Sequence, residues 1–187
     1  MKKELYVSYA WGGQSETVYN KISVACVTNK IKLTSDKTDL NFRELISSFM
    51  QRLGQSNHVV VVISDRYLKS ANCMFELLEI SKNGDFKKRI FPIVLKSASI
   101  YDPLGIIKYI KYWERKIDAL NLAMSSLTNH GNLQGIRNTL DLYIKIRELF
   151  ASITDILKDM KCERLDFHLA NDFQLIFDSV KARKKNP

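Results

Sequence analysis

Apolar positions along the first hundred residues fall into two patterns. Short apolar runs of strand length, bounded by polar or turn-forming residues, predict four strands, at residues 5–9, 31–34, 59–63 and 90–95. Apolar residues between these runs recur at steps of three and four, which predicts amphipathic helices. Alternation of strand and helix is typical of a parallel sheet with right-handed crossovers. The chain is therefore predicted to be an α/β protein.

The predicted helices lie at residues 16 to about 29, from about 45 to 54, and after the third strand as far as about residue 83. Ser15 is the expected N-cap of the first helix, because its hydroxyl can accept a bond from a free backbone N–H. The run Val59 to Ile63 is apolar throughout, as expected of a central strand covered on both faces.

The pattern changes beyond about residue 100. Ile106 to Tyr112 could hold a brief fifth strand, and the rest is predicted to be helical. The expected helices are residues 113 to about 127, 133 to about 160, and 167 to about 184. We therefore predict a main domain at residues 1–160, followed by a C-terminal helical extension or linker at 161–187.

Composition limits the possible function classes. The 187 residues carry a formal net charge of +9, but the basic residues are spread along the chain apart from a cluster at 181–185, which is best explained as a solvated tail. We therefore expect no direct binding to nucleic acid. No apolar run is long enough to span a bilayer, so no membrane contact is expected. Three widely spaced cysteines suit a reducing, cytoplasmic compartment and predict no metal site.

The segment Ser70 to Ile80 contains the candidate for chemistry. It follows the buried run 59–63 and is expected to place Glu76 on the first turn of a helix at a strand end, where open α/β sheets bind their ligands. The competing interpretation is that Glu76 and Glu79, three residues apart, both line a solvated helix face.

Several segments, in order, resemble the Toll/interleukin-1 receptor (TIR) domain family, particularly its bacterial members. They are the opening Leu5-Tyr-Val-Ser-Tyr9-Ala-Trp11, the loop Asp36-Lys-Thr-Asp-Leu-Asn-Phe42 that resembles the family's BB loop, the strand 59–63, and Cys73-Met-Phe-Glu76. The last of these is similar to the pattern around the catalytic glutamate of TIR enzymes. The resemblance implies a flavodoxin-like TIR fold, with four to five parallel strands flanked by helices and a helical C-terminal part.

The resemblance also implies an NAD⁺ glycohydrolase of a bacterial defence or effector system, active with or without cyclisation of the ADP-ribose product and activated by self-assembly. NAD⁺ would be the substrate, with no separate cofactor, and Glu76 the catalytic residue. The residues expected to bind substrate are Tyr9, Ala10, Trp11, Asp36, Lys37, Arg43 and Phe75, with core roles as the alternative for Tyr9 and Phe75 and a role in positioning the loop for Asp36. Tyr9 or Trp11 could stack on a base, and Lys37 and Arg43 could neutralise the diphosphate.

Other functions are less compatible with the sequence. Gly12-Gly13 is not followed by the Gly-Lys-Ser/Thr of a phosphate-binding loop, and it does not form the Gly-x-Gly-x-x-Gly of a dinucleotide fold. His58, His130 and His168 stand apart from one another and are assigned structural roles. The remaining alternative is a non-catalytic module that signals by TIR–TIR contact, with the BB loop as its contact surface.

Overall fold

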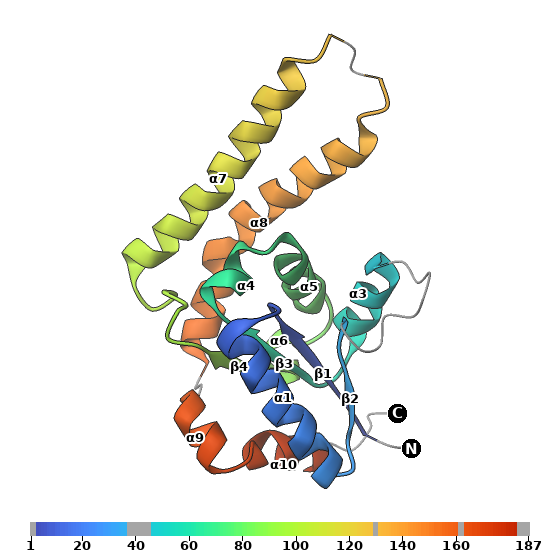
Figure 1. The fold of residues 1–187 in the computed structure, drawn as a ribbon, viewed down its shortest axis with the longest axis vertical. Coiled ribbons are helices and arrows are strands. Elements are labelled where there is room, and N and C mark those ends of the chain that lie inside the picture. The colour runs from blue at the N-terminus through green and yellow to red at the C-terminus, as the bar shows by residue number, and fades with distance from the viewer. Residues whose placement is uncertain (1–2, 37–45, 129–130, 161–162, 183–187) are drawn as a thin grey trace.

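A parallel sheet of four strands occupies the centre of the structure (Figure 1). The computed structural model describes residues 3–36, 46–128, 131–160 and 163–182. The strands are β1 (Glu4–Tyr9), β2 (Lys32–Thr34), β3 (Val59–Ile63) and β4 (Ile90–Val94), in the spatial order β2-β1-β3-β4. All five residues of β3 are buried, as its apolar run predicts. The flavodoxin-like α/β fold predicted from the sequence is confirmed.

Helices cover both faces of this sheet. The face of Leu5, Val7 and Val60 packs against α1 (Gly13–Thr28) and α10 (Gln174–Ala182). The face of Val59 and Val61 packs against α3 (Ile46–Gln55), α5 (Ala71–Lys82) and the inner parts of two longer helices. Successive strand residues point to opposite faces. Within β1, Ser8 therefore points towards α5, whereas Val7 and Tyr9 point towards α1.

The start of α1 differs from the prediction. The helix begins at Gly13, and Ser15 lies buried inside it rather than at its N-cap. The cap position is Gly12, whose positive φ of 87° is open to glycine without strain. The carboxylate of Glu16 accepts the Gly12 N–H at 2.9 Å, so the free donor is satisfied from within the first turns.

The predicted fifth strand at 106–112 is wrong, because these residues belong to helix α7 (Pro103–Ser125). Asp102 caps α7 by accepting the N–H groups of Leu104 and Gly105 at 3.1 Å each, and Pro103 occupies the first helical position. The buried residues of this helix recur every four positions, at Gly105, Tyr109, Trp113 and Ile117. This spacing is helical, and it overrides the β-branched character of the segment.

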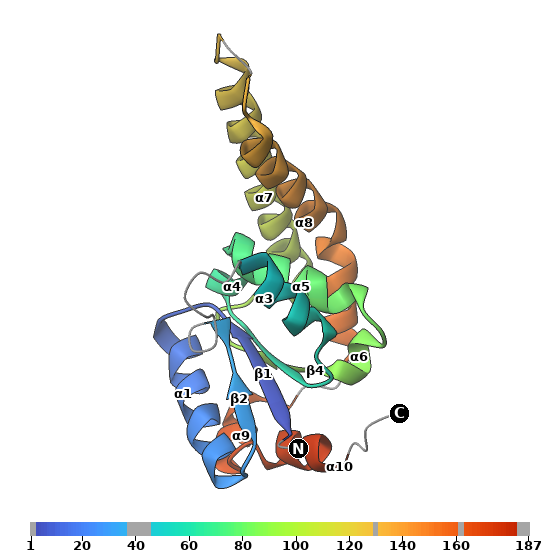
Figure 2. The same ribbon diagram turned by 90° about the vertical axis from the view of Figure 1, so that its right-hand side faces the viewer.

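Helices α7 and α8 (Gln134–Asp159) form a hairpin that extends away from the sheet (Figures 1 and 2). Both helices bury side chains only near the body of the protein, as far as Ile117 in α7 and from Ile146 onwards in α8. The outer turns of both helices contain no buried residue among those described. No helix of the described residues is both long enough and apolar enough to cross a membrane.

The predicted helix at 167–184 is interrupted in the structure. Helix α9 (Leu165–Ala170) ends before Asp172 and Phe173, both of which have positive φ, and α10 then returns along the sheet. Ile176, Phe177 and Val180 of α10 are buried against α1 and the strands. The predicted boundary at residue 160 stays a prediction, although α10 completes the core on this face. Two short helices, α4 (Asp65–Lys69) and α6 (Phe86–Arg89), complete the described elements.

Gly105 allows α7 to approach the segment before it. A Cβ at this position would overlap the backbone carbonyl oxygen of Ser99 and lie 2.6 Å from the Ser99 Cβ. Gly105→Ala is therefore expected to lower the free energy of unfolding by about 1 to 3 kcal/mol, measured by urea denaturation.

Gly135→Ala in α8 is the matched control, because no atom lies within 4 Å of a Cβ built there. This variant is expected to leave stability unchanged or to raise it by up to about 1 kcal/mol. Equal effects of the two substitutions would contradict the close approach at Gly105.

Candidate functional site

The candidate site lies at the C-terminal ends of β1 and β3. Because β2 and β3 flank β1 on opposite sides, the connections after these strands diverge here, and ligands of doubly wound sheets bind at such a switch point. Each of the two helices that follow β3 begins at a serine cap. Ser64 accepts the N–H of Tyr67 at 3.1 Å at the start of α4, and Ser70 accepts the N–H of Cys73 at 3.3 Å at the start of α5.

Helix α4 is absent from the sequence prediction, and its presence changes the position of Glu76. Glu76 lies in the second turn of α5, not on the first turn of a helix that leaves β3 directly. Its side chain points into the protein and is only 3% exposed. The interpretation that Glu76 lines a solvated face is therefore wrong. Glu79 forms an ion pair with Lys82 of the same helix.

A buried hydroxyl group holds the Glu76 carboxyl, and a second buried hydroxyl is bonded to the first. Ser8 of β1 donates a hydrogen bond to Oε2 of Glu76, and the Ser8 Oγ lies 2.8 Å from the hydroxyl of Tyr67 in α4. Ser8 is 1% exposed and Tyr67 is fully buried. β1 thus meets two helices that are distant from it in the sequence, in one chain of polar atoms inside an otherwise apolar cluster. Neither Ser8 nor Tyr67 is among the site residues predicted from the sequence.

Burial determines the charge state of this carboxyl. Loss of hydration raises the pKa of Glu76 to about 8, against the lowering effect of the Ser8 hydrogen bond and with a further increase from the nearby negative charge of Asp36. Burial likewise raises the pKa of the Cys73 thiol to about 12, so this thiol is un-ionised near neutral pH. In this conformation Glu76 is mostly a neutral acid at pH 7.

Trp11 and Asp36 lie together beside the end of β1. The Trp11 side chain is 53% exposed, and its Nε1 donates to Oδ1 of Asp36 at 3.3 Å. Arg66 of α4 donates from Nη1 to the Trp11 carbonyl oxygen at 2.6 Å, so a cation stands at the same edge of the sheet. The sequence prediction did not include Arg66. Its place two residues after the cap that follows β3 is the signal that could have found it.

The structure does not bring together all of the predicted binding residues. Tyr9 lies on the opposite face of the sheet from Glu76, where it is 2% exposed and stacked on Tyr19 with 4.5 Å between ring centroids. Ala10 is buried in the same apolar cluster as α5, and Phe75 packs half-buried against that cluster. Lys37 and Arg43 lie outside the described residues. Their proposed part in diphosphate binding stays a prediction.

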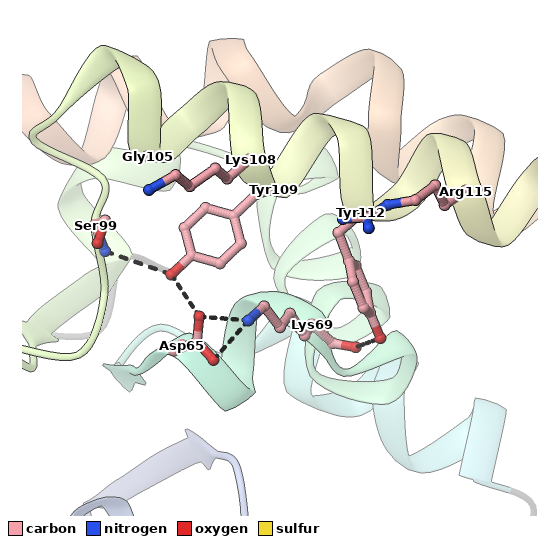
Figure 3. Close-up of a pocket in the computed structure, with 8 residues that line it drawn as sticks. All are labelled: Asp65, Lys69, Ser99, Gly105, Lys108, Tyr109, Tyr112 and Arg115. Atoms are coloured by element: carbon pink, nitrogen blue, oxygen red, sulfur yellow. Dashed lines mark hydrogen bonds and ion pairs between the residues drawn. The ribbon is translucent and has the colours of Figure 1, made fainter.

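A hollow of about 280 Å³ lies between α4 and α7 (Figure 3). It is lined by Asp65, Lys69, Ser99, Gly105, Lys108, Tyr109, Tyr112 and Arg115. The Tyr109 hydroxyl donates to Oδ1 of Asp65 at 3.1 Å, and Asp65 also pairs with Lys69. None of the predicted site residues lines this hollow, so we treat it separately from the Glu76 cluster.

The histidines take no part in the Glu76 cluster as far as the structure describes them. His168 is buried against the ring of Phe173, with 5.9 Å between centroids, and burial lowers its pKa. His58 stacks at 6.5 Å from Phe91, and His130 lies outside the described residues. Among the residues described, no group of three or more His, Cys, Asp or Glu side chains is placed to hold a metal ion.

A sequence profile of the TIR domain matches residues 5–124, and the chain therefore belongs to the TIR domain family. The bacterial type stays a prediction. The fold is also similar to the TIR domains in the structure of the activated Roq1 resistosome directly recognising the pathogen effector XopQ. That match has a TM-score of 0.57 and 20% identity, and it covers 96% of this chain and 98% of the other. No curated protein matches the sequence.

The raised pKa of Glu76 links stability to pH. The folded state keeps a proton that the unfolded state releases near the ordinary value of 4.5. This contribution to stability is complete below about pH 4.5 and is lost as pH rises to about 8. Glu76→Gln is expected to remove this decrease in the free energy of unfolding with pH, which amounts to at most about 1.4 kcal/mol per pH unit.

The measurement is the free energy of urea unfolding at pH 5 and pH 8. Glu79→Gln is the control, since it removes a carboxylate that pairs on the helix surface with Lys82 and should keep the wild-type fall. Parallel profiles for wild type and Glu76→Gln would show that Glu76 is not the titrating group.

Proposed function

We propose that this TIR domain cleaves NAD⁺ between nicotinamide and ribose, as an NAD⁺ nucleosidase. The observation that carries the proposal is the Glu76 carboxyl, held by Ser8 at the switch point of the sheet. Burial of a carboxyl group in an apolar cluster is unfavourable for folding. Acids with strongly perturbed pKa values are concentrated at functional sites. Family membership supports the same assignment, since the resemblance places the catalytic glutamate of TIR enzymes at this position.

The chemistry requires one anionic group. When the glycosidic bond of NAD⁺ breaks, its electron pair goes to the nicotinamide nitrogen, which loses its positive charge, so no strong general acid is needed. The ribose carbon becomes cationic and is then attacked by water, giving ADP-ribose and a proton, or by a nucleophile of the same molecule, giving a cyclic product. A carboxylate beside the ribose stabilises the developing charge and accepts hydrogen bonds from the sugar hydroxyls. Ionised Glu76 is that group.

The conformation described here corresponds to a resting form. Glu76 is 3% exposed and neutral at pH 7, so the reaction requires the carboxyl to become both accessible and charged. Trp11 and Asp36 lie at the adjoining surface, and movement of this pair would uncover the cluster and carry the Asp36 charge away from Glu76. We propose that contact between copies of the domain drives this change, in the cytoplasm of a bacterium, within a defence or effector system.

Incubation with NAD⁺ tests the proposal through the release of free nicotinamide. Wild-type protein is expected to release nicotinamide at a rate that rises with pH towards about 8, because the ionised form of Glu76 is the active one. Glu76→Ala and Glu76→Gln should lower the rate by at least about 100-fold. Glu79→Gln should retain it. Turnover that survives in Glu76→Ala would remove the site assignment.

The alternative function is a non-catalytic TIR–TIR interaction module, and the burial of Glu76 is the observation that favours it. Under this alternative Glu76 is only a core residue, and no nicotinamide is released even at high protein concentration or with a crowding agent. Self-association, measured by sedimentation, would then persist without any NAD⁺ cleavage.

Arg66 lies beside Trp11 near the end of β1, and we propose that it binds the diphosphate of NAD⁺. Arg66→Gln is expected to raise KM for NAD⁺ about tenfold with little change in kcat, since the diphosphate is bound equally in substrate and transition state. Lys82→Gln is the control, because Lys82 lies at the far end of α5 and pairs with Glu79. An unchanged KM in Arg66→Gln would place the diphosphate elsewhere.

A further inference from the structure

Tyr67 is linked to Glu76 through two successive hydrogen bonds, with Ser8 between them. Its hydroxyl lies 2.8 Å from the Ser8 Oγ, and Ser8 in turn donates to Oε2 of Glu76. Tyr67 is fully buried, so water does not compete for this hydroxyl. The ring is held in place from its own backbone, since the Tyr67 N–H donates to the Ser64 cap at 3.1 Å. The hydroxyl therefore has a defined position and a defined neighbour.

The direction of the two bonds follows from proton counting. A serine hydroxyl has one proton. When Ser8 uses this proton to donate a hydrogen bond to an ionised Glu76, its oxygen can only accept a hydrogen bond from Tyr67. Tyr67 must then donate to Ser8. Burial and the neighbouring Glu76 raise the pKa of Tyr67, so its proton is retained near neutral pH. Two hydroxyl dipoles thus align head to tail towards the carboxylate, and each strengthens the other.

We propose that Tyr67 is a positioning residue which, through Ser8, orients the Glu76 carboxyl and favours its ionised form. This inference rests on the proposed NAD⁺ cleavage for its functional meaning. Its structural content is separate, because the proposed effect on Glu76 depends on the tyrosine hydroxyl and not on the space that the ring fills.

The other groups around Glu76 do not favour its ionised form. Asp36, beyond the end of β2, opposes ionisation through its negative charge, and Cys73 on α5 is a neutral thiol. No described residue of α3, α6 or α8, the other helices packed against α5, is among the groups that act on the charge of Glu76. Within the described part of the chain, Ser8 alone favours the ionised form, and Tyr67 is the donor behind it.

The test follows the titration of Glu76 itself by NMR of its side-chain carboxyl carbon. The signal is assigned by its loss in Glu76→Gln, and its midpoint is then measured in variants. Tyr67→Phe removes only the hydroxyl oxygen and is expected to raise the midpoint by about half to one pH unit. Ser8→Ala removes the direct bond and is expected to raise it further. The pH dependence of nicotinamide release should move in the same direction and by the same amount.

Tyr109→Phe is the matched control. Tyr109 is also a buried tyrosine with a hydrogen-bonded hydroxyl, but its partners are Asp65 and the Ser99 N–H rather than Ser8. It should leave the Glu76 midpoint at the wild-type value. The double variant Ser8→Ala/Tyr67→Phe should shift the midpoint no more than Ser8→Ala alone, because Tyr67 acts only through Ser8.

The outcomes separate the two proposals. A wild-type midpoint in Tyr67→Phe, or additive shifts in the double variant, overturns the role of Tyr67. Absence of nicotinamide release from the wild type overturns the proposed function, while the carboxyl titration still decides the role of Tyr67. Should Tyr67→Phe not fold, a fluorinated tyrosine placed at residue 67, a stronger donor of nearly the same size, is expected to lower the midpoint. A raised or unchanged midpoint in the fluorinated protein overturns the role of Tyr67.

Discussion

The confinement of one carboxyl group between β1 and α5 is the constraint around which this end of the molecule is organised. The pairing of β1 with β3 sets Ser8 opposite Val61, so its hydroxyl enters the layer between the sheet and α5. Glu76 reaches the same layer from the second turn of α5, which the short α4 offsets from the strand end. The carboxyl is thereby removed from water and supplied with a single strong partner.

This arrangement links the fold to its proposed activity through charge. A neutral Glu76 is compatible with its apolar surroundings, whereas cleavage of a glycosidic bond requires the anion. The resting fold and the active site therefore favour different protonation states of the same group. A partner that displaced Asp36 would change the protonation of Glu76, because the negative charge of Asp36 opposes its ionisation.

The sequence predicted the architecture better than it predicted the site. The apolar run 59–63 and the helical spacing around it were sufficient for the central strand and the α/β class. Ile106 to Tyr112 misled because branched and aromatic residues also suit a strand, although Asp102-Pro103 marks a helix start. The break at Asp172 and Phe173 uses positive φ without glycine, and Asn171-Asp172 is a weaker turn signal than glycine would be.

Within the candidate site, Glu76 is predicted both from its position after the buried strand and from the family resemblance, but its partners are not. Leu5, Val7 and Tyr9 alternate on one face of β1, which implies that Ser8 points to the other face. This periodicity favours Ser8 over Tyr9 as the predicted site residue. The link to Tyr67 could not be predicted, since it depends on the turn that α4 introduces after β3. The side-chain contacts among β1, α4 and α5 depend on tertiary packing, which local sequence patterns do not predict.

The α7–α8 hairpin has a consequence for how the molecule moves. Its outer turns, beyond Ile117 and before Leu142, contain no buried residue among those described, so little core packing opposes their separation. Local opening from the tip is therefore much less unfavourable than opening near Trp113 or Phe150, which are anchored in the core. Backbone amides should exchange with deuterated solvent along a gradient that slows towards the sheet. The same pair of helices is thus expected to be stable near the sheet and less stable in its outer turns.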